Sequence, residues 1–329
     1  NSPGSNLPEP NPPASNPAGS SPPSLFLQPG GASWWFSIWV GPRGLRAGWR
    51  VLIYVVLVLF FDVILTVGAV VVAKATGYPI QLVPGHAVRP SLRLVFLNDG
   101  PLFAAAILAA LLLGRFEGRG LPAFGLPWHG AFGKRFWWGA LWGGVAISAL
   151  LGGIAATGSF QIHGFSGGFG RLLGPGLAFA AAFALVGFAE EFSFRGYPLT
   201  TLTGGMGFWP AAIILSIAFG GVHAGNGGEA VWGVLSAGLI GLFFCFTILR
   251  TGTLWFAIGF HFFWDFAESF IYAVPDSGLV LKHAMVRSAF SGSHWLTGGS
   301  VGPEGSLLIF PLIAILFWLF HRAYPAARF

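Results

Sequence analysis

Eight apolar segments constrain the fold of this chain more than any other feature of its sequence. Crossing the hydrocarbon core of a bilayer takes about 20 residues, and the backbone groups inside it must bond to one another, which favours helices. Only 9% of the 329 residues are charged, whereas soluble domains carry roughly a quarter charged residues. We therefore predict an all-α, polytopic membrane helix bundle of about eight transmembrane helices, over residues 51–73, 95–114, 136–157, 174–201, 208–223, 230–249, 252–274 and 305–321.

The first 33 residues differ in composition from the rest of the chain. They are rich in Pro, Ser and Asn, which cannot bury a core, so we predict a disordered N-terminal tail over residues 1–33. They contain no basic residue ahead of an apolar stretch and therefore do not read as a signal peptide. Residues 34–329 form the predicted integral membrane domain, and the Gly- and Ser-rich segment 275–304 is predicted to be an outer loop.

Lysine and arginine residues predict the orientation of the bundle. In an eight-span topology most of them fall on one side: before the first span, between the second and third, between the sixth and seventh, and after the last. Because positively charged loops stay in the cytoplasm, we predict cytoplasmic termini and a bacterial plasma membrane location, although six basic residues fall on the opposite side. The same rule explains the net charge of +6 without a nucleic-acid partner.

Two adjacent glutamates and an arginine lie in an otherwise uncharged region, in FAEEFSFRGY. Ionisable side chains at membrane depth are functional-site hypotheses by default. Glu191 and Arg195 are four residues apart, so they share a helix face and can pair. Glu190 points about 100° away from Glu191 and is free to face elsewhere. The alternative is that the three residues form only a structural ion-pair set.

His223 is the last residue of the next predicted span, 208–223. It is about as far along the chain from the preceding turn as Glu190 is on the other side. If the two spans form a hairpin about the turn Gly204–Gly207, Glu190 and His223 lie at the same depth in the membrane. A carboxylate and an imidazole at one depth can share a water molecule. The alternative is a histidine that is satisfied within the core.

A second histidine lies in GFHFFWDFAESF, where His261 and Asp265 share a helix face and Glu268 continues that face one turn later. A carboxylate at this spacing can fix the tautomer of the imidazole, and a purely structural pair is the alternative. Zinc binding by His223, His261 and one carboxylate is a third interpretation, although no HExxH motif supports it.

Three other polar features are expected to be structural. Asp62, alone in the first span, is interpreted as a protonated or helix-bridging residue. Asn98 and Asp99 have the character of a helix cap. The single cysteine, Cys245, lies in an apolar run and is expected to be a core residue.

Taken in order, the motifs Glu190-Glu191-x3-Arg195, Phe219-x3-His223 and His261-x3-Asp265 resemble those of the CPBP family of intramembrane endopeptidases. That family includes the CAAX prenyl endopeptidases and many bacterial relatives. The resemblance is strongest over residues 136–274, which it identifies as the protease core.

The resemblance implies a role for each matching residue. Glu190 corresponds to the catalytic glutamate and His223 to the histidine that helps it activate water. His261 corresponds to the second histidine of the site, and Glu191 with Arg195 to the supporting pair. Asp265 stands where the prenyl endopeptidases have asparagine; an ionised aspartate cannot donate a hydrogen bond to an oxyanion, so we expect Asp265 to orient His261 or a metal.

The leading hypothesis is an intramembrane endopeptidase that hydrolyses a peptide bond with a water activated by the glutamate and a histidine. Its substrate would be a membrane protein or peptide, with a lipidated, prenylated one as a named option, and its other partners membrane lipids. Members of the family have been described both as metalloproteases and as metal-free enzymes. We favour the metal-free mechanism; if zinc is a cofactor, Glu190, His223 and His261 are its expected ligands. The alternatives are a non-catalytic scaffold or immunity protein and a proton-coupled transporter.

Overall fold

The computed structural model describes residues 34–42, 44–77, 91–225 and 231–329. The described residues divide into two units, one ending at Gly44 and the other comprising residues from Leu45 to Phe329. The first contains α1 (Trp34–Trp39) and β1 (Val40–Gly41), and the short strand β2 (Gly44–Leu45) lies at the boundary. The predicted disordered tail, residues 1–33, lies outside the described residues.

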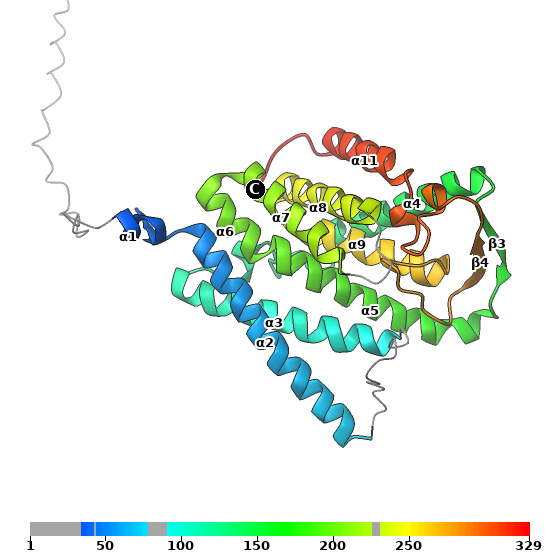
Figure 1. The fold of residues 1–329 in the computed structure, drawn as a ribbon, viewed down its shortest axis with the longest axis horizontal. Coiled ribbons are helices and arrows are strands. Elements are labelled where there is room, and N and C mark those ends of the chain that lie inside the picture. Colours follow the sequence, from blue (N-terminus) through cyan, green and yellow to red (C-terminus); the bar gives the residue numbers. More distant parts are fainter. Residues whose placement is uncertain (1–33, 43, 78–90, 226–230) are drawn as a thin grey trace, which may run out of the picture. The chain divides into compact units, whose positions relative to one another are not determined.

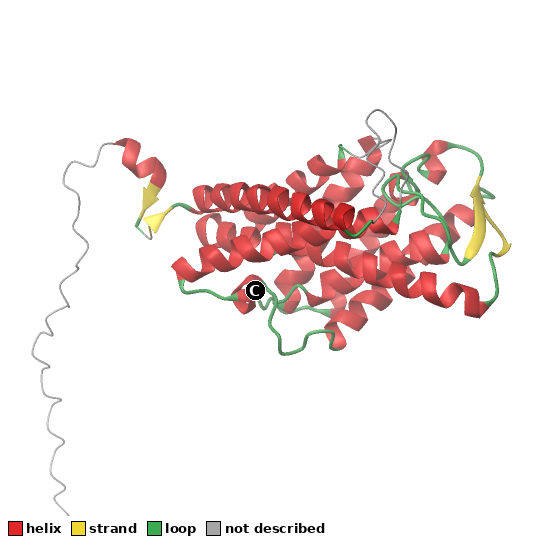
Figure 2. Cartoon of the chain, turned by 90° about the horizontal axis from the view of Figure 1, so that it is seen from below, coloured by secondary structure: helices red, strands yellow, loops and turns green. Residues whose placement is uncertain are grey.

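The second unit is a bundle of helices, as predicted (Figures 1 and 2). In the part of the chain that the structure describes, five helices are long and apolar enough to cross a membrane, and α7 and α11 are shorter apolar helices. The all-α membrane fold is therefore confirmed. The helices are α2 (Ala47–Ala75), α3 (Leu92–Glu117), α4 (Lys134–Ala156), α5 (Phe169–Arg195), α6 (Tyr197–Met206), α7 (Phe208–His223), α8 (Val231–Thr251), α9 (Trp255–Phe266), α10 (His294–Thr297) and α11 (Ile309–Ala323).

The span predicted as one helix over 174–201 is broken at Gly196, between α5 and α6. A β-carbon on Gly196 would lie 2.5 Å from the carbonyl oxygen of Phe192, so the backbone needs a glycine there. Pro198, in the first turn of α6, lacks an N–H group and suits the start of a helix. The turn predicted over 204–207 is shorter in the structure: α6 continues to Met206, and Gly207, with a φ of 84°, alone separates it from α7.

Helices α4 and α9 approach closely because glycines remove side chains from their contact. A β-carbon on Gly139 or Gly143 would lie 2.1 or 2.2 Å from the carbonyl oxygens of Phe256 and Phe260, respectively. In the reverse direction, a β-carbon on Gly259 would lie 2.0 Å from a carbonyl oxygen of α4. Small residues that allow backbones to touch are the usual means of packing helices in membranes. This packing fixes α9, which carries His261 and Asp265.

The segment between α9 and α11, predicted as an outer loop, contains short helical and strand elements. The π-helix η2 (Ala267–Ile271) follows α9, and the short 3-10 helix η3 (Pro303–Gly305) precedes α11. Between them, β4 (Val286–Phe290) pairs antiparallel with β3 (Phe160–Phe165), at one end of the bundle (Figure 2). Another 3-10 helix, η1 (Leu121–Phe124), follows α3. The 275–304 segment is therefore attached to the helix ends.

Candidate active site

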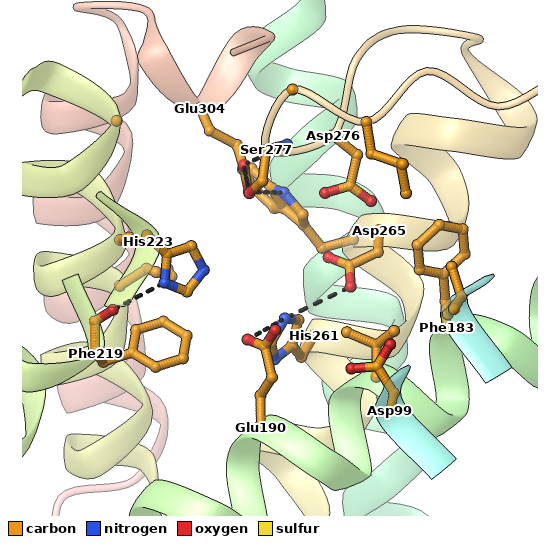
Figure 3. Close-up of a pocket in the computed structure, with 18 of the residues that line it drawn as sticks. Asp99, Phe183, Glu190, Phe219, His223, His261, Asp265, Asp276, Ser277 and Glu304 are labelled. Carbon is orange, nitrogen blue, oxygen red and sulfur yellow. Dashed lines mark hydrogen bonds and ion pairs between the residues drawn. The ribbon is translucent and has the colours of Figure 1, made fainter. Parts of the chain in front are cut away.

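A cavity of about 630 Å³ lies among helices α3, α5, α7, α8 and α9, and the segment 276–279 also lines it (Figure 3). This volume is in the range of about 300–1,000 Å³ that is typical of ligand sites. Glu190 on α5, His223 on α7, and His261 and Asp265 on α9 all line it. The structure thus brings together four residues that the sequence distributes over three separate spans.

Glu191 and Arg195 lie beside this cavity but do not line it. Their side chains are completely buried, and Nη1 of Arg195 donates to Oε1 of Glu191 over 3.0 Å. The guanidinium also lies 4.0 Å from the centre of the Phe219 ring, on α7. A buried guanidinium needs both kinds of contact, because water cannot solvate it there. The pair therefore connects α5 to α7 within the core.

His261 contacts Glu191 and Glu190 in addition to Asp265, the partner that the sequence predicted. Its Nδ1 lies 3.0 Å from Oε1 of Glu191, the same oxygen that accepts from Arg195. Its Nε2 lies 3.5 Å from Oδ2 of Asp265 and 3.8 Å from Oε2 of Glu190. The sequence pattern could find the contact within α9, but not the shorter one between α5 and α9.

Glu190 and His223 border the cavity from different helices (Figure 3). The side chain of Glu190 is 25% exposed, and its Oε2 has no hydrogen-bond partner in the described part of the chain. Nδ1 of His223 lies 2.8 Å from the carbonyl oxygen of Phe219, so it donates there as N–H, and in a neutral imidazole Nε2 is then the acceptor. Glu190 and His223 thus present a carboxylate and an imidazole to the same cavity.

Asp99 is a cavity residue that the sequence interpretation missed. Helix α3 begins at Leu92 with Ser91 as its N-cap residue, so Asn98 and Asp99 lie inside the helix and the predicted cap is wrong. Both residues line the cavity. The available signal was an acid within a helical apolar run, because a carboxylate there seldom faces lipid. Asp62, by contrast, does not line this cavity.

Glu268, which was predicted to continue the face of His261 and Asp265, lies beyond the end of α9. It lies in the π-helix η2, where the N–H of Tyr272 bonds to the carbonyl of Ala267, five residues earlier. This wider turn changes the direction of each following side chain relative to α9. Glu268 is completely buried and does not line the cavity.

The carboxylate of Glu268 instead approaches those of Asp276 and Glu304. The sequence analysis did not single out Asp276 or Glu304, both of which fall in the predicted outer loop. Both line the cavity. Burial raises the pKa of the Asp276 carboxyl well above its usual range, and the charge of Glu304 adds to this effect.

The suggested zinc ligands do not form a ready-made metal site. Among the described residues, the set of His, Cys, Asp or Glu side chains whose ligand atoms come within 4.8 Å of one another is Glu268, Asp276 and Glu304. Glu190, His223 and His261 are not such a set as they are arranged here. The structure therefore lends no support to the metalloprotease interpretation.

Residues 172–267 match the Rce1-like family model, described as type II CAAX prenyl endopeptidase Rce1-like. The predicted resemblance is confirmed. The Rce1-like segment runs from α5 to the start of η2, so it contains each of the three motifs that predicted it. No curated protein matches the chain significantly. The matched model is that of a protease family, and the apolar helices have the length and composition of membrane spans.

Proposed function

We propose that this chain is an intramembrane endopeptidase in which Glu190 activates the attacking water. The observation that supports this most directly is that the two adjacent glutamates have different surroundings. The Glu191 side chain is fully buried and bonds to Arg195 and His261, whereas the Glu190 side chain lines the cavity and is 25% exposed. A carboxylate used only for packing would be expected to bond within the core.

In the proposed reaction, Glu190 takes a proton from a water molecule, with Nε2 of His223 accepting a hydrogen bond from the same water. The water oxygen attacks the carbonyl carbon of the scissile peptide bond. The tetrahedral intermediate collapses as the C–N bond breaks, and Glu190 returns the proton to the leaving amine. Each step uses groups that border one cavity.

His261 is the proposed oxyanion donor. With protons on both ring nitrogens, it donates from Nδ1 to Glu191 and presents Nε2–H to the developing oxyanion. Asp265, 3.5 Å from Nε2, helps to keep that nitrogen protonated. This assignment gives the aspartate a positioning role, since an ionised carboxylate cannot donate to the oxyanion itself.

We propose a metal-free mechanism and a membrane-associated polypeptide as the substrate. A zinc ion at Glu190, His223 and His261 would supply Lewis-acid activation of the water instead. Chelator treatment of the purified protein distinguishes the two. Activity that survives exhaustive chelation supports the metal-free proposal, and activity that is lost and then restored by zinc contradicts it.

The central test uses Glu190→Gln, which keeps the size of the side chain and removes the base. Purified protein in liposomes is given a quenched fluorescent peptide that ends in a CAAX sequence, with and without a farnesyl group. We expect the wild type to release the C-terminal fragment and Glu190→Gln to lose at least a hundredfold in rate, in line with the roughly 10²–10⁴-fold contribution of a general base.

The matched control is Asp62→Asn, which removes a carboxylate from α2 that does not line the cavity. It should retain the wild-type rate. Equal rates in the wild type and a folded Glu190→Gln variant would rule out the proposal and favour a scaffold or transporter. Cleavage of the farnesylated peptide alone would show that the lipid is part of the recognised substrate.

A further inference from the structure

Three carboxylates meet at one end of the cavity, outside the Rce1-like segment 172–267. Glu268 comes from η2, Asp276 from the loop after it, and Glu304 from η3. One oxygen of each lies within 4.8 Å of the others. Figure 3 shows Asp276 and Glu304 at the opposite end of the cavity from Glu190. We call these three residues the acidic cluster.

Glu268 is the least satisfied member of the acidic cluster. Its side chain is completely buried, and neither carboxylate oxygen has a hydrogen-bond partner in the part of the chain that the structure describes. Buried polar groups are almost always bonded, and a buried carboxylate is especially costly when it is not. Among the described side chains, none forms a hydrogen bond that satisfies this carboxylate.

The other two members receive hydrogen bonds from neutral groups only. Nε1 of Trp264 donates to Oε1 of Glu304 over 3.2 Å, and the Ser277 hydroxyl donates to Oε2 over 2.7 Å. The Ser269 hydroxyl donates to Oδ2 of Asp276 over 3.3 Å. No lysine or arginine among the described residues forms an ion pair with any of the three. Among the described residues, no direct ion pair therefore neutralises the acidic cluster.

We propose that the acidic cluster binds a hard divalent cation, with calcium preferred. Calcium takes oxygen ligands at about 2.3–2.6 Å, so two ligands on opposite sides of the ion lie roughly 4.6–5.2 Å apart. The mutual separation of up to 4.8 Å within the cluster fits that geometry. Zinc prefers nitrogen and sulfur ligands, and magnesium requires a tighter octahedron and retains several waters.

The fold gives the ion a path to the cluster, and the bound ion would connect separate parts of the chain. Asp276 and Glu304 line the cavity, so a cation can reach the cluster from there. Once bound, it connects the end of α9 to both ends of the segment that carries β4 and α10. The ion thus fastens one wall of the cavity. This role does not depend on the peptidase reaction and is measurable without it.

Terbium, a luminescent substitute for calcium, gives a direct test because Trp264 bonds to Glu304 and can sensitise its emission. The full-length protein is purified in detergent, stripped with EGTA and titrated with terbium under tryptophan excitation. We expect saturation at one ion per chain and displacement by calcium at concentrations at least tenfold lower than by magnesium. Trp264→Phe should lower the emission intensity more than it shifts the titration midpoint.

Variants locate the bound ion. Glu268→Gln and Glu304→Gln should each weaken terbium binding at least tenfold, whereas Asp62→Asn, in α2, should leave the titration unchanged. Terbium titrations that are identical in the wild type and in folded cluster variants would overturn the proposal. A second result would also overturn it. In that result, calcium does not change the melting temperature of the wild type, and Glu268→Gln melts at a higher temperature than the wild type. The carboxyl groups of the cluster would then share protons instead of binding an ion.

A measurement on the wild type alone covers the case in which the cluster variants do not fold. Limited proteolysis of the segment between Ser277 and Glu304 is followed in calcium and in EGTA. Slower cleavage by at least fivefold in calcium, with no effect of magnesium, supports the proposal. Equal cleavage rates in calcium and EGTA reject it.

Discussion

At the scale of single residues, adjacent glutamates differ because a helix sends neighbouring side chains in different directions. Glu191 points into the core and shares one oxygen between Arg195 and His261. Glu190 points into the cavity, 3.8 Å from Nε2 of the same histidine. Glu191 therefore links a guanidinium and an imidazole that would otherwise each need a separate partner. We infer that it positions His261 for the chemistry assigned to Glu190.

Replacement of Glu191 by glutamine should cost stability as well as activity. It leaves the fully buried Arg195 without its carboxylate, and breaking a buried ion pair typically costs about 3–5 kcal/mol. We expect a lower melting temperature in detergent than for the wild type, together with impaired turnover. Glu190→Gln, on the cavity side, should lose turnover at an unchanged or higher melting temperature. Similar melting temperatures for the two variants would contradict this division of roles.

At the scale of elements, the position of the site on α9 depends on a glycine contact with α4. A β-carbon on Gly143 would lie 2.2 Å from the carbonyl oxygen of Phe260, one residue before His261. Gly143→Ala should therefore push α9 away and destabilise the bundle by about 1–3 kcal/mol, the usual cost of overpacking. Although Gly143 does not line the cavity, we expect turnover to fall because His261 moves with its helix.

Gly152 provides a matched control on the same helix, since a β-carbon there has no neighbour within 4 Å. Gly152→Ala should leave the melting temperature and the turnover close to those of the wild type. Both variants are compared by thermal unfolding in detergent and by the peptide release assay. Equal effects of the two substitutions would show that helix propensity, and not the contact between α4 and α9, is responsible.

At the scale of the whole molecule, the predicted orientation can be tested by labelling introduced cysteines, because the chain has a single native cysteine. Cys245 is completely buried, so a membrane-impermeant maleimide should label only a cysteine introduced on the surface. Lys282 and Arg322 are exposed positions that the topology places on opposite sides of the membrane. Lys282→Cys should be labelled in intact cells, and Arg322→Cys only after permeabilisation. The reverse pattern would invert the predicted orientation.

The sequence by itself was sufficient for the helical membrane fold, because long apolar segments with few charges have few other stable structures in lipid. It was also sufficient for the motifs around Glu190, His223 and His261, since residues four apart on one helix share a face whatever the helix packs against. The match to the Rce1-like family over residues 172–267 agrees with these local patterns.

The tertiary structure decided which groups meet across helices. The contact of Glu191 with His261, the place of Asp99 in the cavity and the meeting of Glu268 with Asp276 and Glu304 all join separate elements. Helical periodicity places side chains only relative to their own axis. Contacts between helices depend on how the axes pack, and here that packing depends on glycines whose partners are far away in the sequence.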